Sequence, residues 1–463
     1  MSQITAKSKS KKAENYFAPL AVVTLLFFMW GFITCMNDIL IPHLQEVFTL
    51  KNWQAMLVQT AFFGAYFVVS LGYYAFSVLK FDPIGKIGYK NGIVLGLLIA
   101  AIGCALFLPA ATMLSYGFFL FALFVLACGI TLLQIAANPY VAILGPPDGA
   151  SSRLNMTQAF NSLGTTLAPV IGGYLIFQTV GEGIIDASSV KLPYLGLSAT
   201  LIVLALAIKL FPLPEIQLSQ SMHTSSRLFK NRHLVFGVIA IFAYVGGEVA
   251  IGSNIINFAR LPHIAGLSEA EASHFLALFW GGAMVGRFFG AIALASGKDI
   301  QKRLLLISII FLVALLAVAS IYGLQAALYS GILILVNVVV LVIGKFIPQR
   351  TLWLFAAAVI VLLSITIFTD GYLALWALIA IGLFNSIMFP TIFTLSISGL
   401  GKSTSQASSI LVMAIVGGAI ITPIQGLFAD YFGSVQFSFI VPLACYLYIM
   451  FFGINGYKIK KTD

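Results

Sequence analysis

The stretch FAPLAVVTLLFFMWGFITCMNDILIPHLQEVF, residues 17–48, decides the fold. Its residues are mostly apolar, and at about 1.5 Å rise per residue the run is long enough to cross a bilayer as a helix. Asn37 and Asp38 interrupt the apolar run close to its end. A charged carboxylate in hydrocarbon is costly, so an intramembrane Asp indicates a functional site with a partner elsewhere in the chain. A second interpretation stays open, in which Asp38 lies near the outer interface and is solvated there.

The composition excludes a soluble globular protein. Of 463 residues, 60% are hydrophobic and only 9% are charged, whereas soluble domains carry about 25% charged residues. Long unbroken apolar runs indicate spanning helices rather than the short alternating segments of a barrel. The net charge of +10 is spread over short loops instead of one face, so we expect no nucleic-acid partner.

Fourteen apolar runs are long enough to span a bilayer, which predicts an all-α polytopic membrane protein embedded in lipid. They cover approximately residues 17–45, 53–79, 91–110, 113–144, 154–178, 192–211, 233–258, 272–296, 303–321, 325–343, 352–369, 372–398, 405–429 and 436–456.

The basic residues fix the orientation of these spans. With the N-terminus in the cytoplasm, all but four of the 25 Lys and Arg residues fall on the cytoplasmic side. The exceptions are Lys51, Lys191 and Arg260 on the outer side and Arg287 within a span. This asymmetry follows the positive-inside rule, so we expect both termini to be cytoplasmic.

A long polar loop divides the chain into two halves. Residues 212–232 separate six N-terminal spans from the rest. We therefore expect an N-terminal half at 1–211, a cytoplasmic loop at 212–232 and a C-terminal half at 233–463.

A spacing of glycine and proline recurs in the fifth and thirteenth spans. The matching residues are Gly164, Pro169 and Gly172, and Gly418, Pro423 and Gly426. Weak repeats related by an axis along the membrane normal are typical of transporters with a site between two halves. Chance recurrence is the alternative, because both residue types are common in membrane helices. The correspondence leaves two spans of the second half without a counterpart.

Amide side chains within the spans are the best candidates for binding a substrate. Gln134 and Asn138 are four residues apart, and Gln158 and Asn161 are three apart, so each pair shares a helical face. Amides both donate and accept hydrogen bonds, which suits a neutral polyhydroxyl ligand. They also hold helices together, at about 0.6 kcal/mol each. With the aromatic rings that would pack on sugar C–H faces, the candidates are Gln134, Asn138, Gln158, Asn161, Asn254, Asn385, Trp280 and Phe393.

Three further charged residues are candidates for coupling or gating. Glu248 is the only other carboxylate that we place within a span, and it is a candidate to share the role of Asp38. Arg287 would pair with a carboxylate or reach the cytoplasmic interface by snorkelling, and we favour a structural or gating role. Asp82 belongs to a short loop with glycines and lysines, for which gating and simple solvation are equally good interpretations.

Long strings of residues resemble the fucose, galactose and glucose permeases of the major facilitator superfamily, most closely their bacterial glucose/galactose transporter branch. The matching strings are FMWGF (28–32), NDILIP (37–42), QIAANP (134–139), QAFNSLG (158–164) and FNSIMFPTIF (384–393). The loop that contains Asp82 resembles a degenerate form of the loop motif of the superfamily. The resemblance implies a fold of two six-helix halves in a bacterial inner membrane, with the two extra helices at about 303–343.

The resemblance also implies a cation-coupled sugar symporter that works by alternating access. Asp38 would be the coupling carboxylate with Asn37 beside it, and the sugar path would be lined by Gln134, Asn138, Gln158, Asn161 and Asn385. Proton-coupled fucose permeases carry a glutamate where this chain has Gln134, so the ion stays open. Either Asp38 takes up a proton, or it acts as a metal ligand, joining Asn and backbone oxygens around Na⁺.

We therefore predict a monomeric symporter that imports a neutral hexose, glucose or galactose, with H⁺ or Na⁺ and no other cofactor. A related sugar such as fucose or N-acetylglucosamine, an exporter of amphipathic compounds and a sugar receptor are the alternatives. An enzyme is disfavoured because the spans contain no Ser/His/Asp set, metal-ligand cluster or phosphate loop.

Overall fold

The computed structural model describes residues 17–79, 83–144, 150–178, 187–213, 230–293, 300–345, 347–400 and 404–459. Every regular element in these ranges is a helix. The N-terminal elements are α1 (Phe17–Val47), α2 (Asn52–Ala55), α3 (Leu57–Leu79), α4 (Pro83–Ile87), α5 (Tyr89–Ala105), α6 (Phe107–Thr112), α7 (Tyr116–Ile143), α8 (Ala150–Gly173) with a π turn (Tyr174–Gln178), a 3₁₀ turn (Ala187–Val190) and α9 (Lys191–Leu210).

The C-terminal elements follow a loop that lies mostly outside the described residues. They are α10 (Arg232–Arg260), α11 (Glu269–Ala293), α12 (Ile300–Ile343), α13 (Pro348–Phe368), α14 (Gly371–Asn385), α15 (Met388–Ile397), α16 (Thr404–Met413), a 3₁₀ turn (Ala414–Val416), α17 (Gly417–Phe432), a 3₁₀ turn (Phe437–Phe439), α18 (Ile440–Phe451) and a π turn (Phe452–Gly456).

Eleven stretches of the described residues are long and apolar enough to cross a membrane. One of them, α12, is 44 residues long and turns at Gly323, whose φ of 84° is left-handed, so it corresponds to two of the expected spans. The helices α8 and α11, with 24 and 25 residues, occupy two further expected positions but are more polar. The all-helical membrane fold is confirmed, while the count of fourteen spans stays a prediction.

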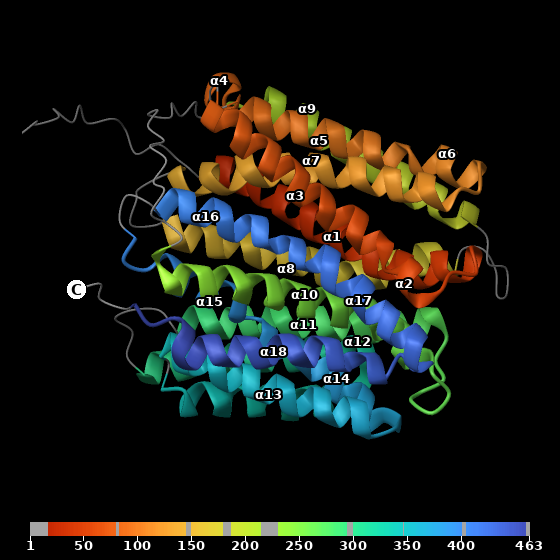
Figure 1. Cartoon of the computed structure of the whole chain (residues 1–463), viewed down its shortest axis with the longest axis vertical. Helices are drawn as coiled ribbons and strands as arrows, with labels where there is room; N and C mark the ends of the chain where they lie inside the picture. Colours follow the sequence, from red (N-terminus) through yellow and green to blue (C-terminus); the bar gives the residue numbers. More distant parts are fainter. Residues whose placement is uncertain are drawn as a thin grey trace, which may run out of the picture.

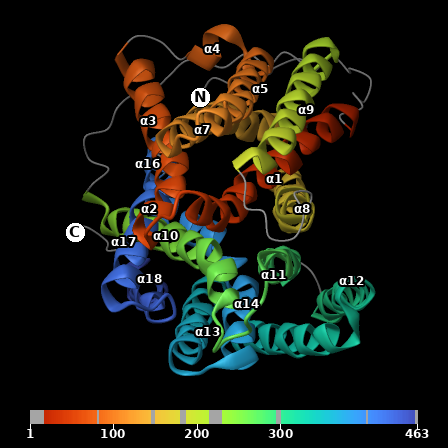
Figure 2. The same cartoon turned by 90° about the vertical axis from the view of Figure 1, so that its right-hand side faces the viewer.

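The helices pack as two groups that meet along one seam. In the first, α1 packs on α8, and α7 packs on α3 and α5; in the second, α10 packs on α15, α17 and α18. The seam is formed by α1 with α10, α8 with α11, and α17 with α2 and α3 (Figure 2). We call the end of the bundle where α1 ends at Val47 and α10 ends at Arg260 the Glu46 end; it lies on the right in Figure 1.

Glycines allow the closest helix crossings in both groups. A Cβ on Gly164 of α8 would lie 2.1 Å from the Phe28 carbonyl oxygen of α1, so only glycine fits there. The same kind of crossing joins α17 to α10, where a Cβ on Gly417 would lie 2.0 Å from the Phe242 carbonyl oxygen. Small residues at helix interfaces let membrane helices approach closely. The expected repeat pairs Gly164 with Gly418, whose Cβ would instead lie 2.9 Å from the Phe63 ring of α3, so the repeat stays a prediction.

The helix α12 lies at the periphery, against α11, α13 and α14 (Figure 2). Most of its large apolar side chains are exposed, which is the composition of a lipid-facing surface. Its second arm turns one narrow stripe toward the protein, formed by Ala327, Gly331, Ile334, Asn337 and Leu341.

One expected span is interrupted in mid-course. The run predicted at 372–398 forms α14, which ends at Asn385, and α15, which begins at Met388. Pro390 explains the interruption, because it has no N–H to donate to the carbonyl of Ser386 and its ring clashes with that carbonyl.

Candidate functional site

Asp38 lies at the centre of a buried hydrogen-bond network. Only 4% of its surface is exposed. One carboxylate oxygen accepts from Gln59 Nε2 at 2.8 Å and from Ser253 Oγ at 3.1 Å. The other accepts from Trp280 Nε1 at 3.3 Å and from Cys35 Sγ at 3.8 Å. These four donors satisfy a carboxylate away from water, which rules out the interpretation that Asp38 is simply solvated at an interface.

The donors to Asp38 come from both groups of helices. Cys35 belongs to α1 and Gln59 to α3, whereas Ser253 belongs to α10 and Trp280 to α11. Gln59 Nε2 also donates to Ser253 Oγ at 2.9 Å, which closes the network across the seam. The carboxylate therefore holds the two groups together in the conformation described.

Three buried polar atoms of Asn37 and Gln59, the sequence neighbour and a hydrogen-bond partner of Asp38, have no partner among the described residues. Asn37 is fully buried, and neither atom of its amide is hydrogen-bonded within the described residues. The Oε1 atom of Gln59 is unpaired in the same sense. Pro42 lies inside α1 and has no N–H to donate to the Asp38 carbonyl. Unpaired buried polar atoms are rare in folded proteins and are common where an ion, water or ligand binds.

Two further polar contacts join α1 to α10 between Asp38 and the Glu46 end. Asn257 Nδ2 donates to Gln45 Oε1 at 2.8 Å, and the Arg260 guanidinium pairs with the Glu46 carboxylate. Asp38 and Gln45 are seven residues apart, so they share a face of α1. Together with the bond from Ser253 to Asp38, these contacts form a ladder of three rungs along the two helices.

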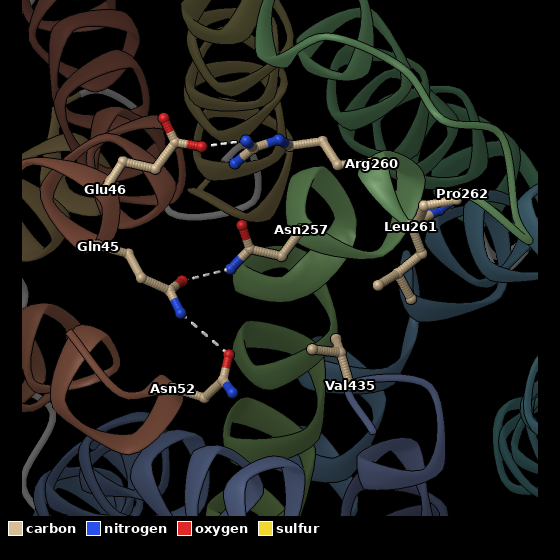
Figure 3. A pocket seen from close by; sticks show the side chains of 8 residues that line it. All are labelled: Gln45, Glu46, Asn52, Asn257, Arg260, Leu261, Pro262 and Val435. Carbon is tan, nitrogen blue, oxygen red and sulfur yellow. Dashed lines mark hydrogen bonds and ion pairs between the residues drawn. The ribbon is translucent and has the colours of Figure 1, made fainter. Parts of the chain in front are cut away.

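A cavity of about 370 Å³ lies at the Glu46 end between the two groups (Figure 3). It is lined by Gln45, Glu46, Asn52, Asn257, Arg260, Leu261, Pro262 and Val435. Beside it, the Asp430 carboxylate of α17 accepts from the backbone N–H groups of Asn52 and Trp53 at 3.0 and 2.9 Å. An anion at the N-terminus of α2 is electrostatically favourable. Both groups contribute to the cavity wall, so separating them would open it.

Burial affects one carboxyl group beside this cavity. Arg260 also pairs with Glu269, at 2.8 Å. Burial raises the pKa of Glu269 from 4.5 to about 7, while Arg260 opposes the rise and Glu46 adds to it. The closed arrangement of this end therefore favours protonation of Glu269 more than an exposed arrangement would.

A second buried network surrounds the interruption between α14 and α15. Tyr244 O–H donates to Glu248 Oε1 at 2.6 Å, and the same hydroxyl lies 3.0 Å from the Asn385 carbonyl oxygen, its alternative acceptor. Tyr446 O–H donates to Asn385 Oδ1 at 2.7 Å, while Asn385 Nδ2 is buried without a partner among the described residues. Arg287 interacts electrostatically with Glu248. The amide of Asn385 is thus fixed on its acceptor side and free on its donor side.

Arg287 also crosses the seam, where its guanidinium donates to Ser162 Oγ of α8. It does not snorkel to an interface but lies between the two groups. Ser162 Oγ in turn donates to the Gln158 backbone carbonyl of its own helix, at 3.0 Å. Gln134 of α7 has a buried Oε1 without a partner among the described residues. Gln134 and Asn385 therefore retain buried, unpaired atoms for a ligand, while the role of Gln158 stays a prediction.

Other predicted residues are engaged in packing. Asn161 Nδ2 donates to the Phe27 carbonyl at 2.9 Å and ties α8 to α1. Asn254 Nδ2 donates to Ala250 within its own helix, at 2.9 Å. Phe393 stacks on Phe389. Trp280 uses its N–H to reach Asp38, a role that differs from the expected packing against sugar.

Two predicted residues lie outside what the structure describes. They are Asp82 and the side chain of Asn138.

Sequence reasoning missed the residues that complete the network from the other group. Ser253, Arg260 and Asp430 carry no motif, and their partners are more than 200 residues away in the chain. Gln59 was visible only as one polar residue in an apolar run.

Buried polar residues shared by two groups of membrane-spanning helices define a membrane transport protein. The chain matches the Major Facilitator Superfamily over residues 20–344. It is 46% identical to the glucose/galactose transporter of Brucella abortus, over 97% of each chain, and 32% identical to the L-fucose-proton symporter of Escherichia coli, over 95% of this chain and 93% of that one. The chain therefore belongs to the major facilitator superfamily.

The solved structures agree with this assignment. The major facilitator transporter FucP, in its outward conformation, is 31% identical, with a TM-score of 0.63 over 96% of this chain and 100% of that one. These relatives are transporters, so the prediction that the chain is not an enzyme is confirmed.

Proposed function

We propose that this protein is a cation-coupled symporter that imports a neutral hexose, with glucose and galactose as the preferred substrates. The observation that carries the proposal is Asp38, a buried carboxylate that accepts hydrogen bonds from both groups of helices. A change in its charge alters contacts on both sides of the seam, which is what coupling an ion to alternating access requires.

The sugar assignment is supported by the relatives and by the chemistry of the free side chains. Curated relatives carry the names of glucose/galactose and L-fucose transporters. The unpaired atoms include one acceptor, Gln134 Oε1, and one donor, Asn385 Nδ2. A sugar hydroxyl both donates and accepts, so such atoms would suit it. Fucose is the competing substrate.

The coupling ion has two candidates in the same place. A proton on Asp38 would turn one acceptor oxygen into a donor, which is incompatible with the full set of four donors around it. A Na⁺ ion prefers hard oxygen ligands, and the Asp38 carboxylate and the unpaired Oε1 of its partner Gln59 would supply them, whereas Asn37 lies on another side of α1. In both cases the ion weakens the bonds that hold the two groups together.

The conformation is closed at the Glu46 end. With both termini in the cytoplasm, this end faces the periplasm of a bacterial inner membrane, and the structure would correspond to the state that releases sugar inward. We retain the division into halves at 1–211 and 233–463, and a monomer as the functional unit.

Uptake of labelled glucose and galactose into proteoliposomes, with a Na⁺ gradient or a pH gradient imposed separately, tests the function. We expect one gradient to drive accumulation, and Asp38→Asn to abolish accumulation while exchange of labelled for unlabelled sugar persists. Labelled fucose in the same vesicles tests the competing substrate. If none of these sugars exchanges in the wild-type protein, the proposal is wrong.

A further inference from the structure

The peripheral helix α12 carries one polar residue where it faces the protein. Asn337 is fully buried, whereas the other residues of the stripe are Ala327, Gly331, Ile334 and Leu341. Around this stripe α12 is apolar and exposed, as a lipid-facing helix is. A leucine at position 337 would pack against α14 equally well. Burying an amide there costs free energy unless it forms a hydrogen bond, so we expect Asn337 to have a hydrogen-bond partner.

That partner is at the interruption between α14 and α15. Asn337 Nδ2 donates to the Leu383 carbonyl at 3.3 Å, and Ser386 Oγ donates to the same carbonyl at 2.7 Å. The last carbonyls of a helix have no partner from the following turn. Because α14 ends at Asn385, two side chains replace the missing backbone donors, and one of them comes from α12.

The neighbouring helix α11 leaves little room for the interruption to shift. A Cβ on Gly286 would lie 2.4 Å from Ser386 Oγ and 2.6 Å from the Leu383 carbonyl oxygen. The interruption is therefore held between Gly286 on one side and Asn337 on the other. Asn385, two residues after Leu383, presents a buried and unpaired N–H pair from this position.

We propose that Asn337 is a positioning residue: the helical hairpin α12 uses it to fix the interrupted helix, and thereby the amide of Asn385, for substrate. The inference deepens the proposed function and rests on it for the identity of the substrate. It gives the two surplus helices a role in the site, in addition to contact with lipid.

Hydrogen–deuterium exchange of the purified full-length protein tests the positioning step without any substrate. We expect Asn337→Leu to speed exchange of the amides at 383–388 about threefold, since an interhelical hydrogen bond in a membrane averages about 0.6 kcal/mol. Asn337→Gln retains a donor and should restore part of the protection. Gln325→Leu is the matched control, because Gln325 is an exposed amide of the same hairpin and its one hydrogen bond among the described residues is to Tyr329, at 3.5 Å.

Sugar exchange in proteoliposomes then tests the consequence for the site. We expect Asn337→Leu to raise the KM about threefold with an unchanged maximal rate, and Gln325→Leu to change neither. Unchanged deuterium exchange at 383–388 would overturn the inference whether or not the protein carries sugar. Faster deuterium exchange with an unchanged KM would reduce Asn337 to an anchor and also overturn it. Absence of sugar exchange by the wild-type protein would instead refute the proposed function.

Discussion

Replacing Asp38 by asparagine should release the closed arrangement of the two helix groups. The substitution keeps the size of the side chain and removes its charge, so it separates electrostatics from packing. Two of the four donors to Asp38, Ser253 and Trp280, belong to the opposite group and lose a charged acceptor. The asparagine amide also replaces one acceptor oxygen with an N–H donor, and the Trp280 indole N–H cannot accept from it.

The magnitude follows from the two bonds across the seam. A hydrogen bond to a charged group contributes about 1.5–3 kcal/mol, and a neutral one about 0.5–1.5 kcal/mol. Losing about 1 kcal/mol at each of two bonds destabilises the closed state by about 2 kcal/mol relative to the open one. The ratio of closed to open molecules should therefore fall about 30-fold.

Distances between spin labels at the Glu46 end measure this ratio. Lys51 and Pro262 are exposed, lie in different groups and suit replacement by labelled cysteines. In the same background Cys35 becomes serine, which keeps a donor, and the other native cysteines become alanine. We expect Asp38→Asn to transfer population to longer distances, and Ser253→Ala to do so by about tenfold, because it removes two cross-seam bonds, the one to Asp38 and the one from Gln59.

Thr24→Val is the matched control within α1, because the Thr24 hydroxyl bonds only the Leu20 carbonyl of its own helix. It should leave the distances unchanged. An unchanged distance distribution in Asp38→Asn would refute the argument that the charge of Asp38 holds the groups together.

Two further predictions concern the Glu46 end. Asp430→Asn weakens the contact with the N-terminus of α2, and a lost helix cap costs about 1 kcal/mol, so the same labels should report about fivefold less of the closed state; no change would show that the contact is incidental. Glu269 has a raised pKa when the end is closed, so the closed state binds its proton more tightly and should be favoured at low pH and lost as pH rises through about 7. Glu269→Gln should flatten this part of the pH profile of the label distances, and a persisting slope would assign it to another group.

The membrane fold could be predicted from the sequence because apolar length alone requires it. Asp38 stood out for the same reason, since a carboxylate in an apolar run has no role in packing. The interruption at 386–387 had a local signal as well, because Pro390 removes the donor four residues later. The sequence analysis nevertheless predicts a continuous span at 372–398.

The pairings across the seam could not be predicted from one sequence. Asn161 and Asn254 are the same residue type as Asn37 and Asn385, but the first two bond to backbone carbonyls and the last two retain free atoms. Whether an amide holds helices together or faces a ligand depends on what the neighbouring helix places opposite it. The sequence predicts that Trp280 packs on a sugar, whereas its N–H donates a hydrogen bond to Asp38. This contact arises because α11 packs on α8 and α10, which are also the neighbours of α1.

The three rungs between α1 and α10 give a reason why one carboxylate can control the conformation. Asp38 and Gln45 are separated by about 10 Å along the helix, so the Asp38 rung contributes nearly independently of the other two, yet separating two rigid helices breaks all three together. The rung at Glu46 and Arg260 is partly exposed, and such pairs contribute at most about 1 kcal/mol. An ion shifts an equilibrium only by its differential affinity for the two states. Because the rung between Glu46 and Arg260 is weak, the free energy that favours the closed state stays small. A change in the charge of Asp38 is then large enough to reverse the balance between the closed and open states.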